Sequence, residues 1–244
     1  MPRARRITAG PRSILRPFYR SLRSSRLRRA FTRSVSRDEI HRYWQSPWDG
    51  DNAPDSYIPG EERSWFLVDL VGRHASTEDR LLELGCNIGR NLHYLSVAGY
   101  RDLSAIEISG AAVERMRDVY PSTAASANIY LGPLEEVLPT LSPSSFDLVF
   151  TMAVLEHVHT DSEPVVFPNV TRATRHTLVT IEDERSVSWR HFPRRYDEVF
   201  VPLGMREVET ISCDTVPGLG PDIVARVFRK EPGAESPFRV RWDD

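Results

Sequence analysis

The segment from Arg80 to Asn91, RLLELGCNIGRN, constrains the fold of this chain more than any other feature. A short apolar run leads into a turn with glycines, and a second apolar run, Leu103–Ser109, carries Glu107 near its end. Strand, glycine turn, helix and a second strand that ends in a carboxylate are the order of a nucleotide-binding βαβ unit. The segment therefore predicts a pocket for a cofactor that carries adenosine.

The spacing of the glycines indicates which cofactor the turn suits. A dinucleotide turn needs glycine at its first, third and sixth positions, because the pyrophosphate approaches the backbone closely. Counted from Gly85, the third position is Asn87 and the sixth is Arg90, so the dinucleotide pattern fails twice. The pattern that stands there is Glu83-x-Gly85-x-Asn87-x-Gly89.

This pattern resembles the first motif, E-x-G-x-G-x-G, of the class I S-adenosylmethionine-dependent methyltransferases. Asn87 replaces the middle glycine, which is a mild departure because asparagine tolerates positive φ better than other non-glycine residues. In that family the glycine loop holds the methionine part of the cofactor. An acid at the end of the second strand, matched here by Glu107, holds both ribose hydroxyls through charge-assisted hydrogen bonds. The alternative for Glu107, an ordinary surface charge at a strand end, is disfavoured by the loop upstream.

The adenine side of the expected pocket departs from the family. The third strand, Asn128–Leu131, leads to Gly132, and the family usually has an acid next that takes the adenine amino group. Pro133 occupies that place. The resemblance then implies that adenine is read by backbone groups around Leu134 or by Glu135.

The segment Ser145–Val158 is the second strong signal, because an apolar strand runs into AVLEHV, which resembles the family's fourth motif. The resemblance places Thr151 and Met152 beside the methionine end of the cofactor, with Glu156 and His157 starting the next helix near the methyl group. His157 is the residue most able to take a proton near neutral pH, so it and Glu156 are the candidate catalytic residues. The alternative is that His157 only holds a helix to the sheet. The residues expected to bind the cofactor are Glu83, Gly85, Cys86, Asn87, Gly89, Asn91, Glu107, Ile108, Leu134, Glu135, Thr151 and Met152.

Further apolar runs at Thr177–Ile181, Met205–Cys213 and Asp222–Arg229 predict three more strands. A terminal antiparallel hairpin on a parallel sheet is typical of the same family. We therefore expect an α/β fold with a doubly wound, seven-stranded, mostly parallel sheet. The acids Glu182–Glu184 follow the fifth predicted strand, where they would hold an amine substrate or solvate a loop.

Two segments outside the motifs carry candidate substrate contacts. The cap segment, residues 38–61, is rich in aromatics, and from it we expect Trp44 and Tyr57 to contact substrate. The segment Ser188–Phe200 mixes basic and aromatic residues, and it is either an anion-gripping substrate element or an exposed amphipathic helix. Its candidate substrate-binding residues are Arg190, His191, Arg194 and Tyr196.

The net charge of −2 conceals a strong asymmetry, because residues 1–37 contain twelve arginines and no acid. The remainder of the chain, residues 38–244, carries 20 basic and 34 acidic residues, a formal charge of −14. Three interpretations of this basic tail are open. It is a solvated disordered arm, a docking element for an anionic membrane surface or acidic polymer, or an organelle-targeting peptide.

Composition bounds the rest of the prediction. No run approaches the roughly 20 apolar residues that a membrane span needs. Two cysteines are too few for a disulfide framework or a zinc site, so we expect a reducing compartment and no metal. We expect a cytoplasmic protein, with peripheral membrane contact as a variant of that expectation, and the sequence does not indicate an oligomeric state. The domain prediction is a basic tail (1–37), a cap segment (38–61), a methyltransferase domain (62–230) and a C-terminal tail (231–244).

The resemblance is specific for cofactor binding and leaves the acceptor open. The favoured function is methyl transfer from S-adenosylmethionine to an oxygen or nitrogen of a small-molecule or glycan acceptor. An RNA or protein methyltransferase that docks through its arginine-rich tail is the second hypothesis. A cofactor-binding protein without catalysis is the third. The residues Met152–Leu155 lack an N-P-P-Y-type motif, which disfavours methylation of exocyclic nucleic-acid amines.

Overall fold

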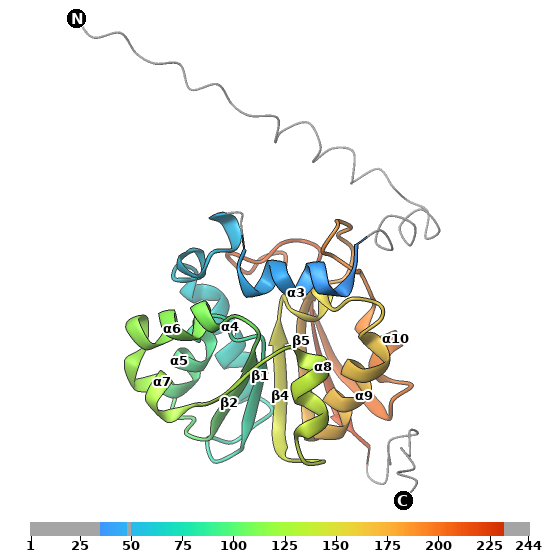
Figure 1. Cartoon of the computed structure of the whole chain (residues 1–244). Helices are drawn as coiled ribbons and strands as arrows, with labels where there is room; N and C mark the ends of the chain where they lie inside the picture. The colour runs from blue at the N-terminus through green and yellow to red at the C-terminus, as the bar shows by residue number, and fades with distance from the viewer. Residues whose placement is uncertain (1–34, 48–49, 232–244) are drawn as a thin grey trace, which may run out of the picture.

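Seven strands form one sheet in the order β3-β2-β1-β4-β5-β7-β6. The computed structural model describes residues 35–47 and 50–231 (Figure 1). The strands are β1 (Leu81–Leu84), β2 (Leu103–Glu107), β3 (Asn128–Leu131), β4 (Phe146–Met152), β5 (Thr174–Asp183), β6 (Met205–Ser212) and β7 (Ile223–Lys230). β1 to β5 pair in parallel, whereas β7 runs antiparallel to both β5 and β6. The predicted doubly wound sheet with its terminal antiparallel hairpin is confirmed.

Helices cover both faces of the sheet, and a cap crosses one end of it (Figure 1). One face carries α4 (Glu61–Gly72), α5 (Arg90–Val97), α6 (Gly110–Val119) and α7 (Pro121–Ser126). The other carries α8 (Leu134–Val137), η4 (Leu138–Thr140), α9 (Glu163–Ala173) and α10 (Tyr196–Phe200). The cap consists of α3 (Arg37–Gln45), η2 (Gly50–Asn52) and η3 (Pro54–Tyr57), and α3 lies across the carboxyl ends of the strands.

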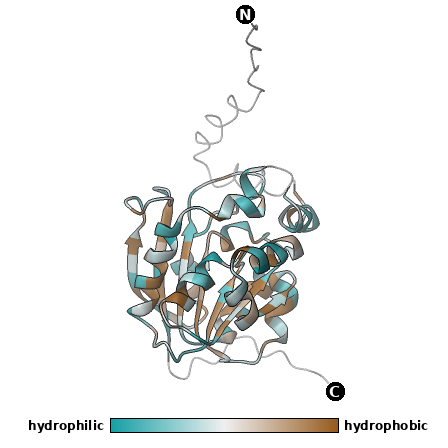
Figure 2. Ribbon diagram, turned by 90° about the vertical axis from the view of Figure 1, so that its left-hand side faces the viewer, coloured by the Kyte–Doolittle hydropathy of each residue, from teal (hydrophilic) through white to brown (hydrophobic). Residues whose placement is uncertain are grey.

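The strands are apolar on both faces, as a parallel sheet between two helical layers requires. Along β4, Leu148 and Phe150 pack with the α4–α5 layer, and Val149 between them packs with the α9–α10 layer. All three side chains are fully buried, and each contributes about 2 kcal/mol through the hydrophobic effect. Figure 2 shows the hydrophobic segments gathered on the strands, with hydrophilic residues spread over the helices. The rigid sheet fixes the strand ends at which the site is built.

β5 is longer than predicted, and this corrects the role expected for Glu182–Glu184. The strand runs to Asp183, and the Glu182 side chain is completely buried rather than available to a substrate amine. Glu184 pairs with Arg226 of β7 at 2.7 Å, with both side chains less than 10% exposed. Glu182 and Glu184 therefore stabilise the fold. An apolar sequence pattern does not predict a charged residue such as Glu182 inside a strand.

Two helical details also differ from the sequence analysis. The helix expected to begin at Glu156 and His157 begins later, as α9 at Glu163. It contains Pro168, a residue that usually interrupts helices, and Arg172 donates to the Leu138 and Leu141 carbonyls. Of the segment Ser188–Phe200, only Tyr196–Phe200 is helical, so the amphipathic-helix alternative is wrong for its first half.

The basic tail and the C-terminal tail lie, apart from residues 35–37 and 231, outside the described residues. The described helices are all too short or too polar to cross a bilayer.

Candidate active site

A cavity of about 400 Å³ opens where the sheet changes winding direction, beyond the carboxyl ends of β1, β2 and β4. In doubly wound sheets this switch point is the usual ligand site. The cap roofs the cavity with Ile40, Trp44, Asn52 and Tyr57. The cavity therefore lies between the motifs at the strand ends of the sheet and the cap formed by α3, η2 and η3.

The loop after β1 is held in a left-handed conformation that few residues adopt. Gly85 has φ +70°, and a Cβ there would come within 2.6 Å of the Val154 side chain. Asn87 has φ +49°, a left-handed conformation that asparagine adopts more readily than other non-glycine residues. Its Oδ1 also accepts a hydrogen bond from the Ile88 amide at 2.8 Å. The loop backbone is thereby fixed against the end of β1.

Glu83 is a buried carboxylate with one oxygen satisfied and one unsatisfied. Its Oε1 accepts from Asn91 Nδ2 at 2.8 Å, and Asn91 Oδ1 accepts from Ser64 Oγ at 2.7 Å. Oε2 has no hydrogen-bond partner among the described residues, although it is buried. Burial raises the pKa of Glu83 to about 8. An unpaired buried oxygen that faces a cavity suits a cationic or hydrogen-bond-donating ligand group.

Glu107 lies at the end of β2, where its two oxygens accept from the backbone. The Asn87 amide donates to Oε2 at 2.6 Å, and the Ser109 amide donates to Oε1 at 2.8 Å. Burial raises the pKa of this carboxyl, and the backbone donors oppose that rise. Each oxygen keeps a second lone pair, so the carboxylate is oriented and still able to accept from a diol.

Glu135, at the predicted adenine end, is engaged by the cap. Its Oε1 lies 2.9 Å from His41 Nε2 of α3 and accepts from Ser162 Oγ at 2.8 Å. Leu134 lines the cavity beside it, and Pro133 begins α8 as its N-cap. Glu135, one of the two alternatives expected to contact adenine, therefore ties the cap to the body.

Glu156 and His157 lie in the 3₁₀ turn η5 (Leu155–His157) that follows β4, rather than at the start of an α-helix. The turn is pinned by Glu182, whose carboxylate accepts from the amides of Val154 and Glu156 at 3.0 and 3.1 Å. Burial and the neighbouring Glu156 raise the pKa of Glu182. The Glu156 and His157 side chains both line the cavity. The buried acid Glu182, which the apolar pattern of β5 does not predict, is needed to accept hydrogen bonds from the backbone of this turn.

The imidazole of His157 is oriented by the loop that follows β5. Its Nδ1 lies 2.8 Å from the Arg190 carbonyl oxygen, so Nδ1 carries the proton and Nε2 is the free acceptor. Burial, reinforced by nearby His191 and Arg190, lowers the pKa of His157 well below its usual value. The Trp44 ring packs against it with centroids 4.5 Å apart. His157 is thus a neutral imidazole held in one tautomer.

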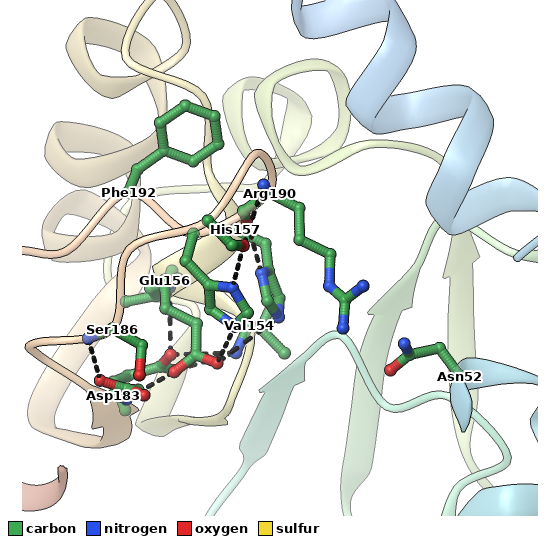
Figure 3. Close-up of polar contacts among 12 residues, drawn as sticks. Asn52, Val154, Glu156, His157, Asp183, Ser186, Arg190 and Phe192 are labelled. Carbon is green, nitrogen blue, oxygen red and sulfur yellow. Dashed lines mark hydrogen bonds and ion pairs between the residues drawn. The ribbon is translucent and has the colours of Figure 1, made fainter. Parts of the chain in front are cut away.

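Arg190 joins the β5 side of the cavity to the cap (Figure 3). Its Nη1 donates to Tyr43 Oη at 3.2 Å, and Asn52 Nδ2 donates to the same oxygen at 2.7 Å. The guanidinium also lies over the rings of Tyr43 and Trp44. In Figure 3 the side chain extends from the loop toward Asn52, across the space above Val154. Four of the predicted substrate contacts line this same cavity: Trp44, Tyr57, Arg190 and His191.

Arg194 and Tyr196 do not line the cavity, which corrects their predicted substrate role. The Arg194 guanidinium donates to Glu163 at 2.7 Å and to the Leu155 carbonyl, so it holds α9 to η5. Tyr196 is completely buried and stacks on Phe200. The mixed basic and aromatic composition of Ser188–Phe200 does not indicate which of its side chains point into the cavity and which pack into the protein core.

Two of the predicted cofactor residues also lie outside the cavity lining. Thr151 is fully buried and donates to Glu182 Oε1 at 2.7 Å, so it supports η5 from below. Gly89 is the N-cap of α5 with φ +73°, where a Cβ would come within 2.6 Å of Met116. Both shape the site from behind it. The remaining predicted cofactor residues line the cavity.

Sequence analysis missed His41 and Arg90, which also line the cavity. Arg90 is buried, and its Nη1 donates to the carbonyls of Tyr57 and Pro59 at 2.8 Å each, anchoring the cap. The sequence feature that could have drawn attention to Arg90 is its position: a charged residue stands where a dinucleotide-binding loop has its third glycine. His41 precedes Trp44 by three residues, a spacing that places both on one helical face.

Comparison with known proteins gives a consistent result. Residues 82–177 match a family model described as "Methyltransferase domain". A chain of the Haloferax volcanii complex between the Trm112 methyltransferase activator and a methyltransferase is 14% identical, with a TM-score of 0.61 over 81% of this chain and 100% of that chain. No curated protein matches the sequence.

Two further solved structures are similar in the same way. Magnesium protoporphyrin IX methyltransferase from Synechocystis, with bound S-adenosylmethionine, is 15% identical, with a TM-score of 0.59 over 79% of this chain and 95% of that chain. A TehB-like S-adenosylmethionine-dependent methyltransferase from Corynebacterium glutamicum is 19% identical, with a TM-score of 0.54 over 80% and 100%. At such identities the likeness shows a shared fold, and activity must be argued from the site.

Proposed function

Because the chain belongs to the class I S-adenosylmethionine-dependent methyltransferases, we propose that it methylates an oxygen or nitrogen of a small-molecule or glycan acceptor. The bound cofactor supplies a methyl group on an electrophilic sulfonium, so the chain's main task is to align the acceptor. The single observation that supports the acceptor class is the roof that α3, η2 and η3 place over the cavity.

The residues around the cavity suit the cofactor. The unpaired Glu83 Oε2 is placed to accept from an ammonium group, and the oriented Glu107 carboxylate is placed to accept from two hydroxyls. The left-handed backbone at Gly85 lets the loop pack closely against Val154 beside the cavity. Loss of either carboxylate is expected to weaken cofactor binding.

At the opposite end of the cavity, His157 and Glu156 are the proposed proton acceptors for a hydroxyl acceptor group. Hydrogen bonding to the Arg190 carbonyl leaves Nε2 of His157 as the basic nitrogen, and Glu156 Oε1 lies 3.5 Å from it. A nearby carboxylate stabilises the imidazolium that forms when the proton is taken. His157 therefore activates the acceptor while Glu156 offsets the new charge.

The cap favours an acceptor that fits beneath it. Trp44 presents an aromatic face beside His157, and Arg190 presents a cation, a pair that suits a ring or an acidic group on a small acceptor. A folded RNA or protein would have to displace α3, which Tyr43 anchors as a completely buried side chain. Two free, buried cysteines support a reducing compartment, and we propose the cytoplasm.

Labelled methyl transfer tests this proposal. The full chain and S-adenosylmethionine carrying a labelled methyl are incubated with pooled small molecules and glycans, and in parallel with RNA and with protein. We expect label in the low-molecular-weight fraction; label in RNA or protein alone would overturn the acceptor class. With the acceptor found, Trp44→Ala should raise its KM, whereas Trp65→Ala, on the exposed side of α4, should leave it unchanged.

A further inference from the structure

Three side chains at the acceptor end of the cavity form a cluster with the geometry of metal ligands. Glu156, His157 and His191 each offer one ligand atom, and these atoms lie within 4.8 Å of one another. Glu156 Oε1 lies 3.5 Å from His157 Nε2 and 3.6 Å from His191 Nε2. All three side chains line the cavity, so an ion and its remaining ligand would face the same space.

The distances are too long for direct hydrogen bonds and suit a bridging ion. A hydrogen bond between nitrogen and oxygen spans about 2.7–3.2 Å. Ligand atoms about 2.0–2.2 Å from a divalent ion lie roughly 3–3.5 Å apart in tetrahedral or octahedral geometry. Both separations from the Glu156 oxygen, 3.5 and 3.6 Å, come close to that range.

The imidazoles are held in the orientation that metal ligation needs. His157 directs Nδ1 to the Arg190 carbonyl at 2.8 Å, and His191 directs Nδ1 to Ser188 Oγ at 2.5 Å. Metal-binding histidines usually bond their second nitrogen in this way, which fixes the tautomer and aims the other nitrogen at the ion. In both residues the nitrogen that faces Glu156 is Nε2.

The backbone joins the two segments that supply the cluster. The Phe192 amide donates to the Glu156 carbonyl at 2.8 Å, which ties the loop after β5 to η5. The second carboxylate oxygen of Glu156 accepts from the Asp183 amide, so Oε1 is the oxygen left for an ion. The nearby Arg190 guanidinium is directed to Tyr43 and to the aromatic rings of the cap. The site is therefore assembled before any ion binds.

We propose that Glu156, His157 and His191 bind a divalent transition-metal cation, with zinc as the best fit. Two neutral imidazole nitrogens and one carboxylate favour zinc-like ions over magnesium or calcium, which prefer oxygen ligands. Three protein ligands leave a coordination position open, the arrangement of reactive rather than structural zinc sites. This inference departs from the sequence-based expectation of no metal, because that expectation rested on cysteines and this site uses none.

The role of the ion rests on the proposed function, whereas the binding does not. An ion with an open position toward the acceptor end of the cavity can hold and polarise an acceptor oxygen. It would then lower the pKa of a hydroxyl there, a task otherwise left to the His157 imidazole. The proposal narrows the acceptor class to molecules with a hydroxyl that can reach this cluster.

Cobalt titration of the full chain, prepared without a polyhistidine tag, tests the site. Co²⁺ is added to the metal-free protein at neutral pH while its visible absorption is followed, and Zn²⁺ is then added as competitor. We expect one equivalent of Co²⁺ to bind and Zn²⁺ to displace it. His157→Gln and His191→Gln should each weaken Co²⁺ binding by about 10- to 100-fold or more. The matched control is His176→Gln. The His176 imidazole is 63% exposed and lies near the start of β5, away from the cluster, so this variant should bind Co²⁺ as the wild type does.

No Co²⁺ binding by the wild-type chain, or equal binding by the wild-type chain and both cluster variants, would overturn the site. Calorimetry with S-adenosylmethionine on the same proteins reports folding independently of the metal. Co²⁺ binding that depends on the cluster, in a chain that methylates no small molecule or glycan, would support the site and count against the proposed function alone.

Discussion

Glu83 combines two properties that a surface carboxylate does not have. It is only 1% exposed, and one of its oxygens has no partner within the described part of the chain. An ionised group in that position loses its hydration without full compensation, which is the reason its pKa rises to about 8. At the wall of a cavity such a residue trades stability for ligand binding, a common cost of functional sites.

This cost is measurable as a pH dependence of stability. Because the folded-state pKa of Glu83 lies above its unfolded value near 4.5, the folded chain keeps a proton that the unfolded chain loses, and stability falls as pH rises from about 4.5 to about 8. Glu83→Gln keeps an acceptor for Asn91 and removes the titration. Relative to the wild type, we expect the free energy of unfolding of the variant to rise by about 4 kcal/mol between pH 5 and pH 8.5 in chemical denaturation. Glu78→Gln, at an exposed position, is the control, and a wild-type-like pH profile for Glu83→Gln would contradict the prediction.

At the scale of elements, the cap is the part of the fold that decides access to the site. α3 begins with a capping box, in which Ser36 Oγ accepts from the Glu39 amide and the Glu39 carboxylate accepts from the Ser36 amide. Its inner face carries His41, which reaches Glu135 of α8, and Tyr43, which is completely buried. The helix therefore has a well-formed N-terminal cap, and the contact of His41 with Glu135, called the latch below, is one of the contacts that hold it to the body.

Breaking this latch should loosen the cap without unfolding the sheet. Burial of Glu135 favours its neutral form, but hydrogen bonds from His41 and Ser162 outweigh this and lower its pKa to about 2. The latch is thus present above pH 4.5 and is lost as pH falls toward 2. We expect Glu135→Gln to destabilise the cap by about 2 kcal/mol, seen as faster hydrogen exchange of the α3 amides at pH 7. The adjacent, exposed Glu136→Gln should leave this exchange unchanged; equal exchange in both variants would show that the latch is not needed.

Elements were predictable from the sequence where one residue pattern dominates. β1 to β4 and the β6–β7 hairpin follow from apolar runs, and the loop at Gly85 follows from its spacing. The sequence predicts β5 too short because buried Glu182 breaks the apolar run, and it places the start of the helix after β4 too early, since α9 begins at Glu163. The His157–His191 pair could not be predicted, because their contact depends on a loop 34 residues away that folds back onto η5. Local pattern fixes the strands, whereas the acceptor end of the site depends on tertiary contacts.

At the scale of the whole molecule, charge is distributed along the chain in two blocks. Residues 1–37 carry twelve arginines without an acid, and the rest of the chain carries a formal charge of −14. An acidic body is repelled by an anionic surface, so any attraction to one must come from the basic segment. That segment lies almost wholly outside the described residues, and its role is open to a direct binding measurement.

We expect the full chain to co-sediment with vesicles that contain phosphatidylserine at low ionic strength, and a chain of residues 38–244 to remain in solution. Each arginine near an anionic leaflet is worth about 1 kcal/mol, so even a few of the twelve would give measurable binding. The attraction is screened within a Debye length of about 8 Å at physiological salt, so raising the salt concentration should release the protein. Vesicles of neutral lipid are the control for apolar adsorption. Equal sedimentation of the two chains with anionic vesicles would rule out docking through the basic segment, and binding that salt does not weaken would show that charge is not its source.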